Sequence, residues 1–521
     1  MGSTGVSALG LRIAIAVLAV TCIYLQVTNP TQISFAFTAD QLTIPSLVDD
    51  VLFNPRFSIS DWVLPDASLI ADALVYLPIR AVVASTPLAL LLFSFTHFLL
   101  LFLGVYLVCR FAFEDATRRA FALVCFLAMF LCLAAAATVY SWPLLELAFV
   151  PFGHAGALIL ALVAFPLYRR AFEHDDWRFE ILAAILSFLG ILSDVLFVAF
   201  FSVPYLVYLV ATGPGFLRLF KPYRFLVAQV FVGVAARYAL TFSDAHDLIV
   251  PHPVPFKNLT GIFDVEREAG RGMEAYFVGS IIACMALVLF YSARRIFMGP
   301  RVYAAPFDRA AIFLALAALS NFCAMSVLWT VPTPMLARYG PAFQAFPLVL
   351  AAIAAARFYP DRGHRGLRAV GASLAATGVA AALWLSPPSA SIDRLATSLI
   401  IQPETETCFA ALGLKSGVAG YWLARPLSMG TEWRYQVNQF TPTDPVIFLH
   451  GTNRSWFSLE MKTGEPIEYN FIVTNGLSLP QVVEAFGPPS TQATCGPYQI
   501  AVYADAAALT ARILARPTVR A

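Results

Sequence analysis

The sequence is organised around an acidic stretch that begins Asp40-Gln41-Leu42-Thr43-Ile44-Pro45-Ser46-Leu47-Val48-Asp49-Asp50. It continues with Ser60-Asp61-Trp62-Val63-Leu64-Pro65-Asp66 and ends at Ala71-Asp72. Six aspartates thus fall within 33 residues of a chain that is otherwise strongly apolar. Ionisable side chains at membrane depth are costly and usually functional. We therefore expect this stretch to form the working face of a membrane enzyme.

The composition places the protein in the membrane. Of its 521 residues, 59% are hydrophobic and 13% are charged, and the mean hydropathy is +0.73. A soluble domain carries about 25% charged residues. The net charge is only +2 and no basic block occurs, which argues against binding to nucleic acid. The lipid bilayer is therefore an expected partner.

Apolar runs of about 17 to 25 residues predict membrane-crossing helices. The chain contains eleven such runs, at residues 8–27, 87–112, 120–140, 154–168, 179–193, 195–211, 225–242, 275–293, 309–330, 341–358 and 368–386. We expect an all-α membrane bundle over residues 1–387, with about eleven transmembrane helices. Residues 388–521 have ordinary polarity and are expected to form a small extracytoplasmic α+β domain.

Arginine and lysine indicate the orientation, because they are enriched in cytoplasmic loops. They cluster after every even-numbered run, for example at Arg118-Arg119 and Arg294-Arg295. The N-terminus is therefore expected in the cytoplasm, with the first helix retained rather than cleaved as a signal peptide. The outer face then holds the first outer loop, 28–86, with an interfacial helix over 66–84, and the C-terminal domain. This describes a multi-pass protein of a bacterial inner membrane, with a periplasmic or extracellular tail.

The C-terminal domain contains the two cysteines outside the apolar runs. Cys408 and Cys495 predict a disulfide if the domain faces an oxidising compartment, and two unrelated thiols are the alternative. We expect helices at 412–423, 479–486 and 506–515, and strands at 434–438, 445–450, 469–474 and 498–503.

Asp40 is the foremost catalytic candidate. A carboxylate near the membrane surface can accept a proton from a sugar hydroxyl or bind a divalent ion. The alternative is an N-cap for a helix that begins at Gln41. Asp49 and Asp50 are expected to point in different directions, one to a cavity and one to solvent. Asp61 and Asp66 fit turns, and Asp72 fits a solvated helix face.

Other outer loops add candidate binding residues. Glu146, His154 and Asp194 share the outer face with Asp40, which is compatible with metal binding or acid–base chemistry. The alternatives are a structural hydrogen-bond donor for His154 and a turn or cap for Asp194. Arg338, next to Tyr339, is suited to bind a phosphate by paired hydrogen bonds, and snorkelling to the interface is the alternative.

Several common catalytic motifs do not occur in the sequence. There is no phosphate-binding glycine loop, no Cys-x-x-Cys pair, no His-Glu-x-x-His helix and no Gly-x-Ser-x-Gly elbow. This argues against nucleotide-driven, zinc-dependent and serine-hydrolase chemistry. We therefore expect no nucleotide cofactor.

The arrangement resembles the GT-C (C-type) glycosyltransferases, and more narrowly bacterial membrane proteins of that superfamily. The resemblance covers most of the chain, through short and degenerate motifs. These are Asp40-x-x-x-x-Pro45, Ser60-Asp61-Trp62-x-Leu64-Pro65, Gly153-His154, Ser193-Asp194, Gly417-x-x-x-Tyr421-Trp422 and Phe486-Gly487-x-Pro489.

The resemblance implies transfer of a sugar from a polyprenyl-phosphate donor to a glycan, lipid or protein acceptor on the outer face. It implies that Asp40 serves as the base or binds a metal, and that Glu146 is the second acidic residue. A divalent cation, Mg²⁺ or Mn²⁺, would be held by Asp40, Glu146 and His154. The chain departs from the family by placing Asp49-Asp50 later in the loop, so the base is either Asp40 or Asp50.

Two other functions compete with this one. A lipid-linked glycan transporter or flippase would need charges inside the helices, and the apolar runs hold almost none apart from Arg237. A GT-C-like bundle without activity could instead act as a scaffold in envelope polymer assembly.

Overall fold

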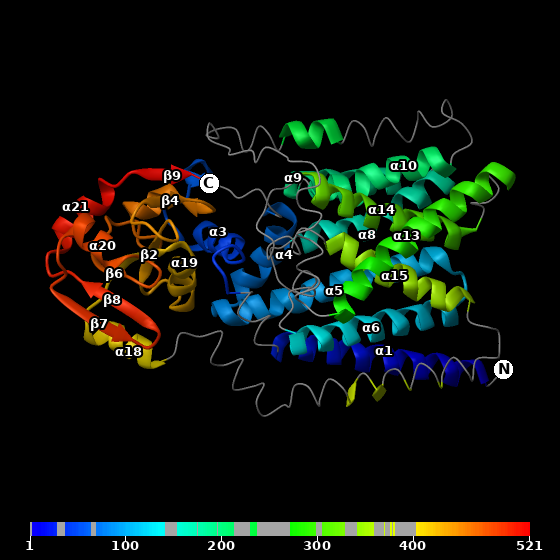
Figure 1. Ribbon diagram of the computed structural model, residues 1–521, viewed down its shortest axis with the longest axis horizontal. Coiled ribbons are helices and arrows are strands. Elements are labelled where there is room, and N and C mark those ends of the chain that lie inside the picture. Colours follow the sequence, from blue (N-terminus) through cyan, green and yellow to red (C-terminus); the bar gives the residue numbers. More distant parts are fainter. Residues whose placement is uncertain are drawn as a thin grey trace.

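The computed structural model describes most of the chain. The described residues are 3–28, 37–63, 69–140, 154–174, 176–194, 196–212, 230–236, 271–298, 305–328, 341–358, 369, 373, 376–377, 379–380 and 403–520. They form a bundle of helices at one end of the molecule and a domain built on a β-sheet at the other (Figure 1). The N-terminus lies at the end of the bundle far from the sheet domain (Figure 1).

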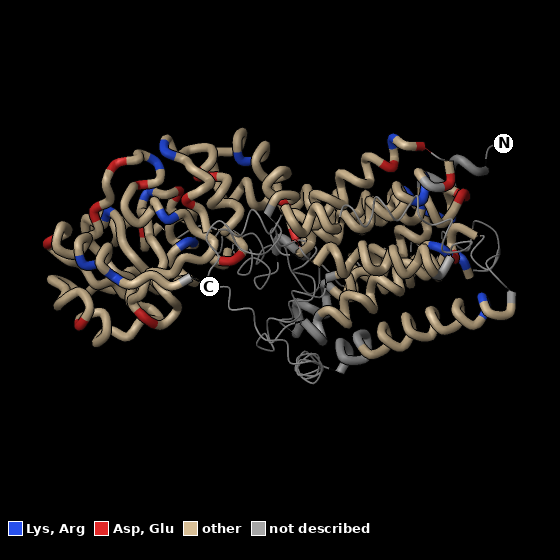
Figure 2. Tube along the Cα trace, turned by 90° about the horizontal axis from the view of Figure 1, so that it is seen from above, with Lys and Arg blue, Asp and Glu red and all other residues tan. Residues whose placement is uncertain are grey.

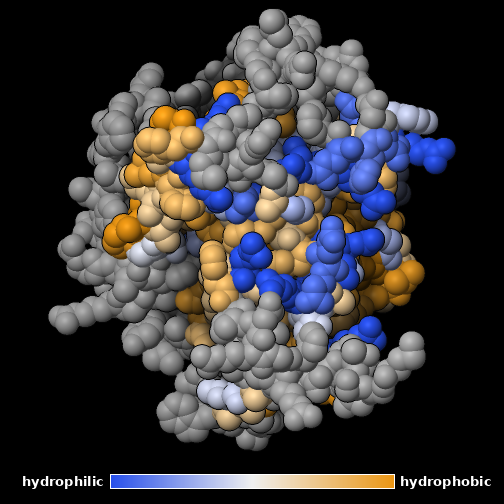
Figure 3. Space-filling model, turned by 90° about the vertical axis from the view of Figure 1, so that its right-hand side faces the viewer, coloured by the Kyte–Doolittle hydropathy of each residue, from blue (hydrophilic) through white to orange (hydrophobic). Residues whose placement is uncertain are grey.

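The bundle consists of long helices that run side by side. They are α1 (Ser3–Thr28), α5 (Thr86–Ala112), α6 (Ala116–Tyr140), α8 (Ala155–His174), α9 (Trp177–Ser193), α10 (Val203–Thr212), which continues the π-helical turn η3 (Val198–Ser202), α13 (Arg271–Met298), α14 (Pro306–Leu328) and α15 (Pro341–Phe358). Figure 2 shows few charged residues along the middle of these helices and more at the end near the N-terminus. Seen from that end, hydrophilic residues gather over the bundle (Figure 3).

Four helices of the described part are long and apolar enough to cross a membrane. They cover Thr86–Ala112, Ala116–Leu133, Val278–Phe297 and Pro306–Ala324. Three shorter apolar helices cover Gly10–Tyr24, Val198–Val210 and Ala342–Phe358. These helices are compatible with a multi-pass membrane protein, although they are fewer than the eleven predicted spans. The predicted runs 225–242 and 368–386 lie largely outside the described residues.

Small side chains and stacked rings bring the helices together. A Cβ atom on Gly104 of α5 would lie 3.0 Å from the Cβ atom of Leu162 on α8, so glycine permits this close approach. The rings of Phe165 and Phe313 stack with centroids 4.1 Å apart and join α8 to α14. Apolar contacts of this kind pack the described helices against one another.

The acidic stretch forms a layer between the bundle and the sheet domain (Figure 1). It contains α3 (Thr43–Phe53), the 3-10 turn η1 (Ile59–Asp61), the short strand β1 (Trp62–Val63) and α4 (Leu69–Val82). α4 is a helix within the range 66–84 where one was expected, and its place at a membrane interface stays a prediction. β1 pairs antiparallel with β5 (Thr452–Asn453), so this layer is hydrogen-bonded to the C-terminal domain.

The C-terminal domain is the predicted mixture of helices and strands. Its seven-stranded sheet has the order β7-β8-β6-β2-β3-β4-β9. The strands are β2 (Ser416–Gly420), β3 (Gln436–Phe440), β4 (Ile447–Leu449), β6 (Tyr469–Val473), β7 (Thr491–Cys495), β8 (Tyr498–Val502) and β9 (Thr518–Arg520). The helices are α18 (Pro403–Ala411), α19 (Tyr421–Gly430), α20 (Leu479–Phe486) and α21 (Ala506–Leu514), and the 3-10 turn η7 spans Arg454–Phe457. α19 connects β2 to its parallel neighbour β3.

The expected helix at 412–423 is wrong. Ser416–Gly420 forms the central strand β2, and α19 begins only at Tyr421. Glycine explains the difference, because a Cβ on Gly417 would lie 2.5 Å from the Phe471 ring of the next strand. Glycine is therefore needed at this position of the closely packed sheet, and its low helix propensity does not favour a helix there.

Cys408 and Cys495 form a disulfide, which is the predicted pairing. The bond joins α18 to the end of the edge strand β7. It closes a loop whose ends are 87 residues apart in sequence, so it restrains most of the C-terminal domain.

Candidate active site

Asp49 and Asp50 are adjacent on α3, and both are completely buried. The expectation that one of them faces solvent is wrong, because the C-terminal domain covers this side of α3. The Asp49 carboxylate accepts hydrogen bonds from Arg80 Nε at 2.6 Å and from Trp433 Nε1 at 2.8 Å. Burial raises the pKa of Asp49, and the bonds from Arg80 and Trp433 act against this rise. Asp49 is thus the anionic half of a buried ion pair.

Asp50 is held by four neutral donors. Its Oδ1 atom accepts from Trp456 Nε1 at 2.8 Å and Asn54 Nδ2 at 2.7 Å. Its Oδ2 atom accepts from Trp62 Nε1 at 2.7 Å and Asn453 Nδ2 at 2.8 Å. A carboxylate has about four lone-pair sites, so these bonds occupy them all. This is the environment of a structural anchor.

Asp40 lies at the contact between the acidic layer and the C-terminal domain, and it is half-buried. The hydroxyl of Tyr421, the first residue of α19, donates a hydrogen bond to Asp40 Oδ1. Asp40 does not cap α3, because that helix begins at Thr43 and its cap residue, Leu42, makes no side-chain bond. The capping alternative is therefore wrong, and the carboxylate is directed to the C-terminal domain.

Arg425 fixes the backbone on which Asp40 sits. Its guanidinium is buried and donates to the carbonyl of Ala39, to Thr43 Oγ1 at 2.6 Å and to the carbonyl of Gly451 at 2.6 Å. Burial lowers the pKa of Arg425, and the nearby Tyr421 and Asp40 act in the opposite direction. Positive charge is therefore held just behind the Asp40 carboxylate.

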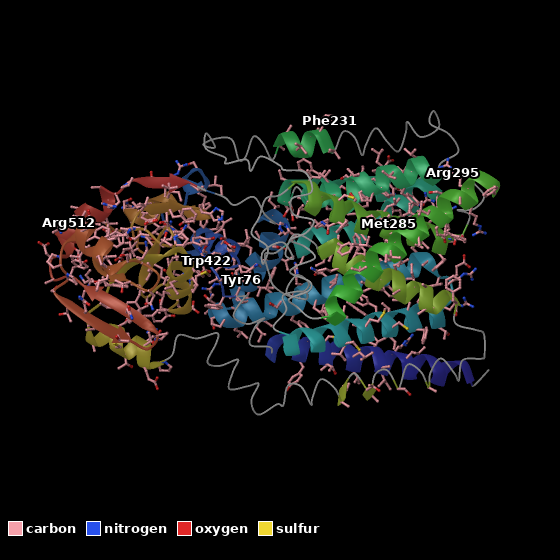
Figure 4. The ribbon with its side chains drawn as sticks, in the orientation of Figure 1. Tyr76, Phe231, Met285, Arg295, Trp422 and Arg512 are labelled. Atoms are coloured by element: carbon pink, nitrogen blue, oxygen red, sulfur yellow. A yellow bond between two sulfur atoms is a disulfide. The ribbon has the colours of Figure 1, made fainter. Side chains whose placement is uncertain are left out.

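Aromatic rings surround the Tyr421–Asp40 contact. The Tyr421 ring lies 4.9 Å from the ring of Trp422, 5.2 Å from Phe448 and 5.7 Å from His450, measured between centroids. Trp422 is 42% exposed, whereas Phe448 and His450 are half-buried. Figure 4 places Trp422 on the side of the C-terminal domain that faces the bundle. A carboxylate and an exposed aromatic ring thus occur together where the C-terminal domain faces the bundle.

His154 immediately precedes α8 and Asp194 immediately follows α9, and the two helix ends bring these side chains together. His154 Nδ1 lies 2.5 Å from Asp194 Oδ2, and both side chains are buried. Asp194 Oδ1 also accepts from the backbone N–H of Leu196 at 2.9 Å. Asp194 therefore combines the turn role suggested as an alternative with a side-chain hydrogen bond to His154.

A second carboxylate–imidazole pair was missed by the sequence reading. Asp72 on α4 and His97 on α5 are both buried, and His97 Nε2 lies 3.0 Å from Asp72 Oδ1. The expectation that Asp72 is on a solvated face is wrong. A signal existed in the sequence, because His97 is the one ionisable imidazole or charged side chain between Arg80 and Arg110.

The remaining predicted site residues lie outside the described part of the chain. These are Glu146, Arg338 and Tyr339. Among the described residues, no group of three or more His, Cys, Asp or Glu side chains is placed to hold a metal ion. The metal set of Asp40, Glu146 and His154 includes a residue outside that part, so it stays a prediction.

Comparison with known proteins gives no family assignment. No protein-family model matches the chain, and none of the curated proteins searched matches it.

Proposed function

We propose that this protein is a membrane glycosyltransferase of the GT-C type. It would move a sugar from a polyprenyl-phosphate donor to a glycan, lipid or protein acceptor on the outer face of a bacterial inner membrane. The observation that carries this proposal is the half-buried Asp40 carboxylate, which accepts a hydrogen bond from Tyr421, whose ring lies 4.9 Å from the ring of the exposed Trp422. The acidic layer, whose helix α3 begins just after Asp40, lies between the sheet domain and the bundle of apolar helices (Figure 1).

This combination suits a saccharide. A carboxylate accepts hydrogen bonds from sugar hydroxyls and can take the proton of an attacking hydroxyl. The C–H-rich face of a sugar packs on an aromatic ring, whose flat surface buries area at little conformational cost. Asp40 supplies the first property and Trp422 the second. In this proposal Asp40 is the base, and the C-terminal domain binds part of the saccharide.

The apolar helices suit a lipid donor. A polyprenyl phosphate is already a good leaving group, so transfer needs no nucleotide and no ATP. Negative charge that grows on the departing phosphate would be stabilised by Arg338, by His154 or by a divalent cation such as Mg²⁺ or Mn²⁺. Glu146 would complete the cation site with Asp40 and His154, while Asp194 and Tyr339 would help to bind the substrate.

The proposed orientation has the N-terminus in the cytoplasm and the C-terminal domain outside, with about eleven crossings. Three observations support it. The N-terminus and the sheet domain lie at opposite ends of the molecule (Figure 1). Hydrophilic residues gather at the end of the bundle near the N-terminus, where Arg295 is labelled (Figures 3 and 4). The disulfide in the C-terminal domain fits an oxidising compartment.

A lipid-linked glycan transporter is the second candidate. It is favoured by the Asp72–His97 pair, which is buried among helices of the bundle. Intramembrane Asp and His residues commonly mark proton relays and transport pathways. A transporter would bind the same lipid phosphate but would not break the bond between phosphate and sugar.

Ligand-induced stabilisation tests whether the protein binds such a lipid. The melting temperature of the detergent-purified protein would be measured with and without polyprenyl phosphate and Mg²⁺, for wild type and Asp40→Asn. Asp444→Asn is the matched control, because Asp444 is exposed on the C-terminal domain. We expect the lipid to stabilise wild type and control, and the Mg²⁺ response to require Asp40. If neither ligand raises the wild-type melting temperature, the proposed function loses its basis.

A further inference from the structure

The turn that follows α19 has an unusual backbone. Glu432 and Trp433 have φ angles of +52° and +60°, which place both residues in the left-handed region. Their N–H groups bond to the carbonyls of Met429 at 3.0 Å and Ser428 at 2.7 Å. This is the pattern in which a helix ends on a left-handed residue that is usually glycine, and Glu432 occupies the glycine position. A side chain there costs free energy, and such strain persists only where the surrounding structure holds it.

The Glu432 carboxylate holds the start of the apolar helix α5. Its Oε1 atom accepts from the backbone N–H of Thr86 at 2.6 Å. Its Oε2 atom accepts from Thr86 Oγ1 at 2.7 Å and from Arg80 Nη2 at 3.2 Å. Thr86 is the first residue of α5, and the preceding residue, Ser85, makes no capping bond with its side chain. Because an acidic group at a helix N-terminus satisfies an N–H and interacts favourably with the helix dipole, Glu432 caps α5 from the C-terminal domain.

Trp433 holds the neighbouring helix α3. Its indole is 7% exposed and donates to Asp49 Oδ2 at 2.8 Å, and its ring lies 4.9 Å from the ring of Trp456. Asp49 is in turn paired with Arg80, which also contacts Glu432. The two left-handed residues therefore hold α3, α4 and α5 through one connected set of hydrogen bonds. We call Glu432 and Trp433 the latch turn.

The other end of α19 lies at the candidate site. Tyr421, its first residue, donates to Asp40, and Arg425, about one turn further on, donates to Thr43 Oγ1 of α3 at 2.6 Å. α19 has ten residues, so a single helix of about 15 Å joins Tyr421 to the latch turn. A displacement of the latch turn is therefore transmitted along α19 to Tyr421 and to the adjacent Trp422.

We propose that the latch turn is a conformational latch on α5 that positions the Asp40–Tyr421 contact. In the latched state, which the structure shows, Glu432 caps α5 and Tyr421 bonds to Asp40. In the unlatched state, Glu432 leaves Thr86, the turn relaxes to an ordinary backbone conformation, and α19 carries Tyr421 away from Asp40. The cost of two left-handed residues weighs against the latched state, so a movement of α5 that breaks the Thr86 bonds releases it. Glu432 is a positioning residue, because it acts through α19.

The inference deepens the proposed function, because the latch would control the site that contains Asp40. It rests on that function only for its biological use. The test follows the position of an aromatic ring and not the transfer of a sugar. A failure of the latch is therefore distinguishable from a failure of the glycosyltransferase proposal.

Fluorine NMR of tryptophan tests the latch. The full-length protein would be labelled with 5-fluorotryptophan at its eight tryptophans and placed in lipid nanodiscs. The signals of Trp422 and Trp433 would be assigned with Trp422→Phe and Trp433→Phe. Tyr421→Phe removes the hydroxyl that bonds to Asp40, so it gives the Trp422 signal of an open contact. We expect Glu432→Gln, which weakens the cap on α5, to move the Trp422 signal towards that position.

Thr86→Val perturbs the latch from the bundle side and leaves the C-terminal domain unchanged. It removes the hydroxyl that donates to Glu432 and should move the Trp422 signal in the same direction. Because both substitutions act on one contact, their combination should move the signal by less than the sum of the two single shifts. Glu484→Gln, at an exposed position of α20, is the matched control and should leave the signal at its wild-type position.

Two substitutions at one position separate the backbone strain from the cap. Glu432→Ala and Glu432→Gly both remove the carboxylate, but only glycine relieves the left-handed backbone. The glycine variant should therefore melt about 4 °C above the alanine variant, and equal melting temperatures would contradict the strain. A Trp422 signal at its wild-type position in both Glu432→Gln and Thr86→Val would overturn the latch. If Glu432→Gln does not fold, Thr86→Val decides alone.

Discussion

Replacing Asp50 by Asn tests what holds the acidic layer to the C-terminal domain. The side chain keeps its shape, but one oxygen that accepts two hydrogen bonds becomes an NH₂ group. The new NH₂ group would then face two N–H donors, which belong either to Trp62 and Asn453 or to Trp456 and Asn54. Two buried donors without partners cost about 2–6 kcal/mol together.

The removal of a buried charge offsets part of this loss, because the carboxylate no longer has to be desolvated. We still expect net destabilisation, since hydrogen bonds to a charged group are worth about 1.5–3 kcal/mol each and Asp50 accepts four of them. Two of the donors to Asp50 are the indoles of Trp62 and Trp456, so tryptophan fluorescence can follow a change at this site.

Thermal unfolding followed by tryptophan fluorescence in detergent gives the measurement. Asp50→Asn should melt earlier than wild type and expose Trp62 and Trp456 to water in a first step, before the C-terminal domain unfolds. Asp444→Asn, at an exposed site, should melt like wild type. Surface substitutions usually change the free energy of unfolding by no more than about 0.5 kcal/mol. If Asp50→Asn changes it by no more than that, the four hydrogen bonds to Asp50 do not hold the acidic layer to the C-terminal domain.

Three further changes follow from the same structure. Arg80→Gln leaves Asp49 as an unpaired buried charge and should cost about 3–5 kcal/mol at neutral pH. Because burial raises the folded-state pKa of Asp49, this loss should shrink as the pH falls through that pKa. It should be smallest below the unfolded value of about 4, where Asp49 is neutral in both states, and a pH-independent loss in melting curves would contradict this. Replacing both Cys408 and Cys495 by Ser removes the cross-link between residues 87 positions apart in the sequence. This should lower the free energy of unfolding of the C-terminal domain by about 4 kcal/mol, and a reductant should not change the melting temperature of the variant. Trp422→Ala should weaken retention on an immobilised glycan at least tenfold with little change in melting temperature, because the ring is 42% exposed; equal retention would remove it from the saccharide site.

Much of the C-terminal domain could be predicted from the sequence, because its signals are local. The helix at 479–486 was predicted with its observed bounds and ends at Gly487, whose φ of +81° suits a glycine. The strand expected at 469–474 matches β6 to within one residue. The central strand β2 was missed, since the glycine at position 417 is explained only by the close approach of Phe471 on another strand.

The candidate site was predictable only in part, because its contacts join distant parts of the chain. The unusual position of Asp40 was visible in the sequence, whereas its partner Tyr421 lies 381 residues further on. Asp50 and Asn453 are 403 residues apart, so no local pattern could show that Asp50 is an anchor. His97 was different, because a lone imidazole in an apolar run is a signal that can be read without a structure.

The central claim is that Asp40 takes part in sugar transfer from a polyprenyl phosphate. The most direct measurement supplies nanodisc-embedded protein with polyprenyl-phosphate sugars and an acceptor pool, and follows release of the free polyprenyl phosphate. Wild type should release it with a matching glycosylated acceptor, and Asp40→Asn should lose at least a hundredfold in rate while its melting temperature stays near that of wild type. Equal rates in wild type and Asp40→Asn would contradict the claim.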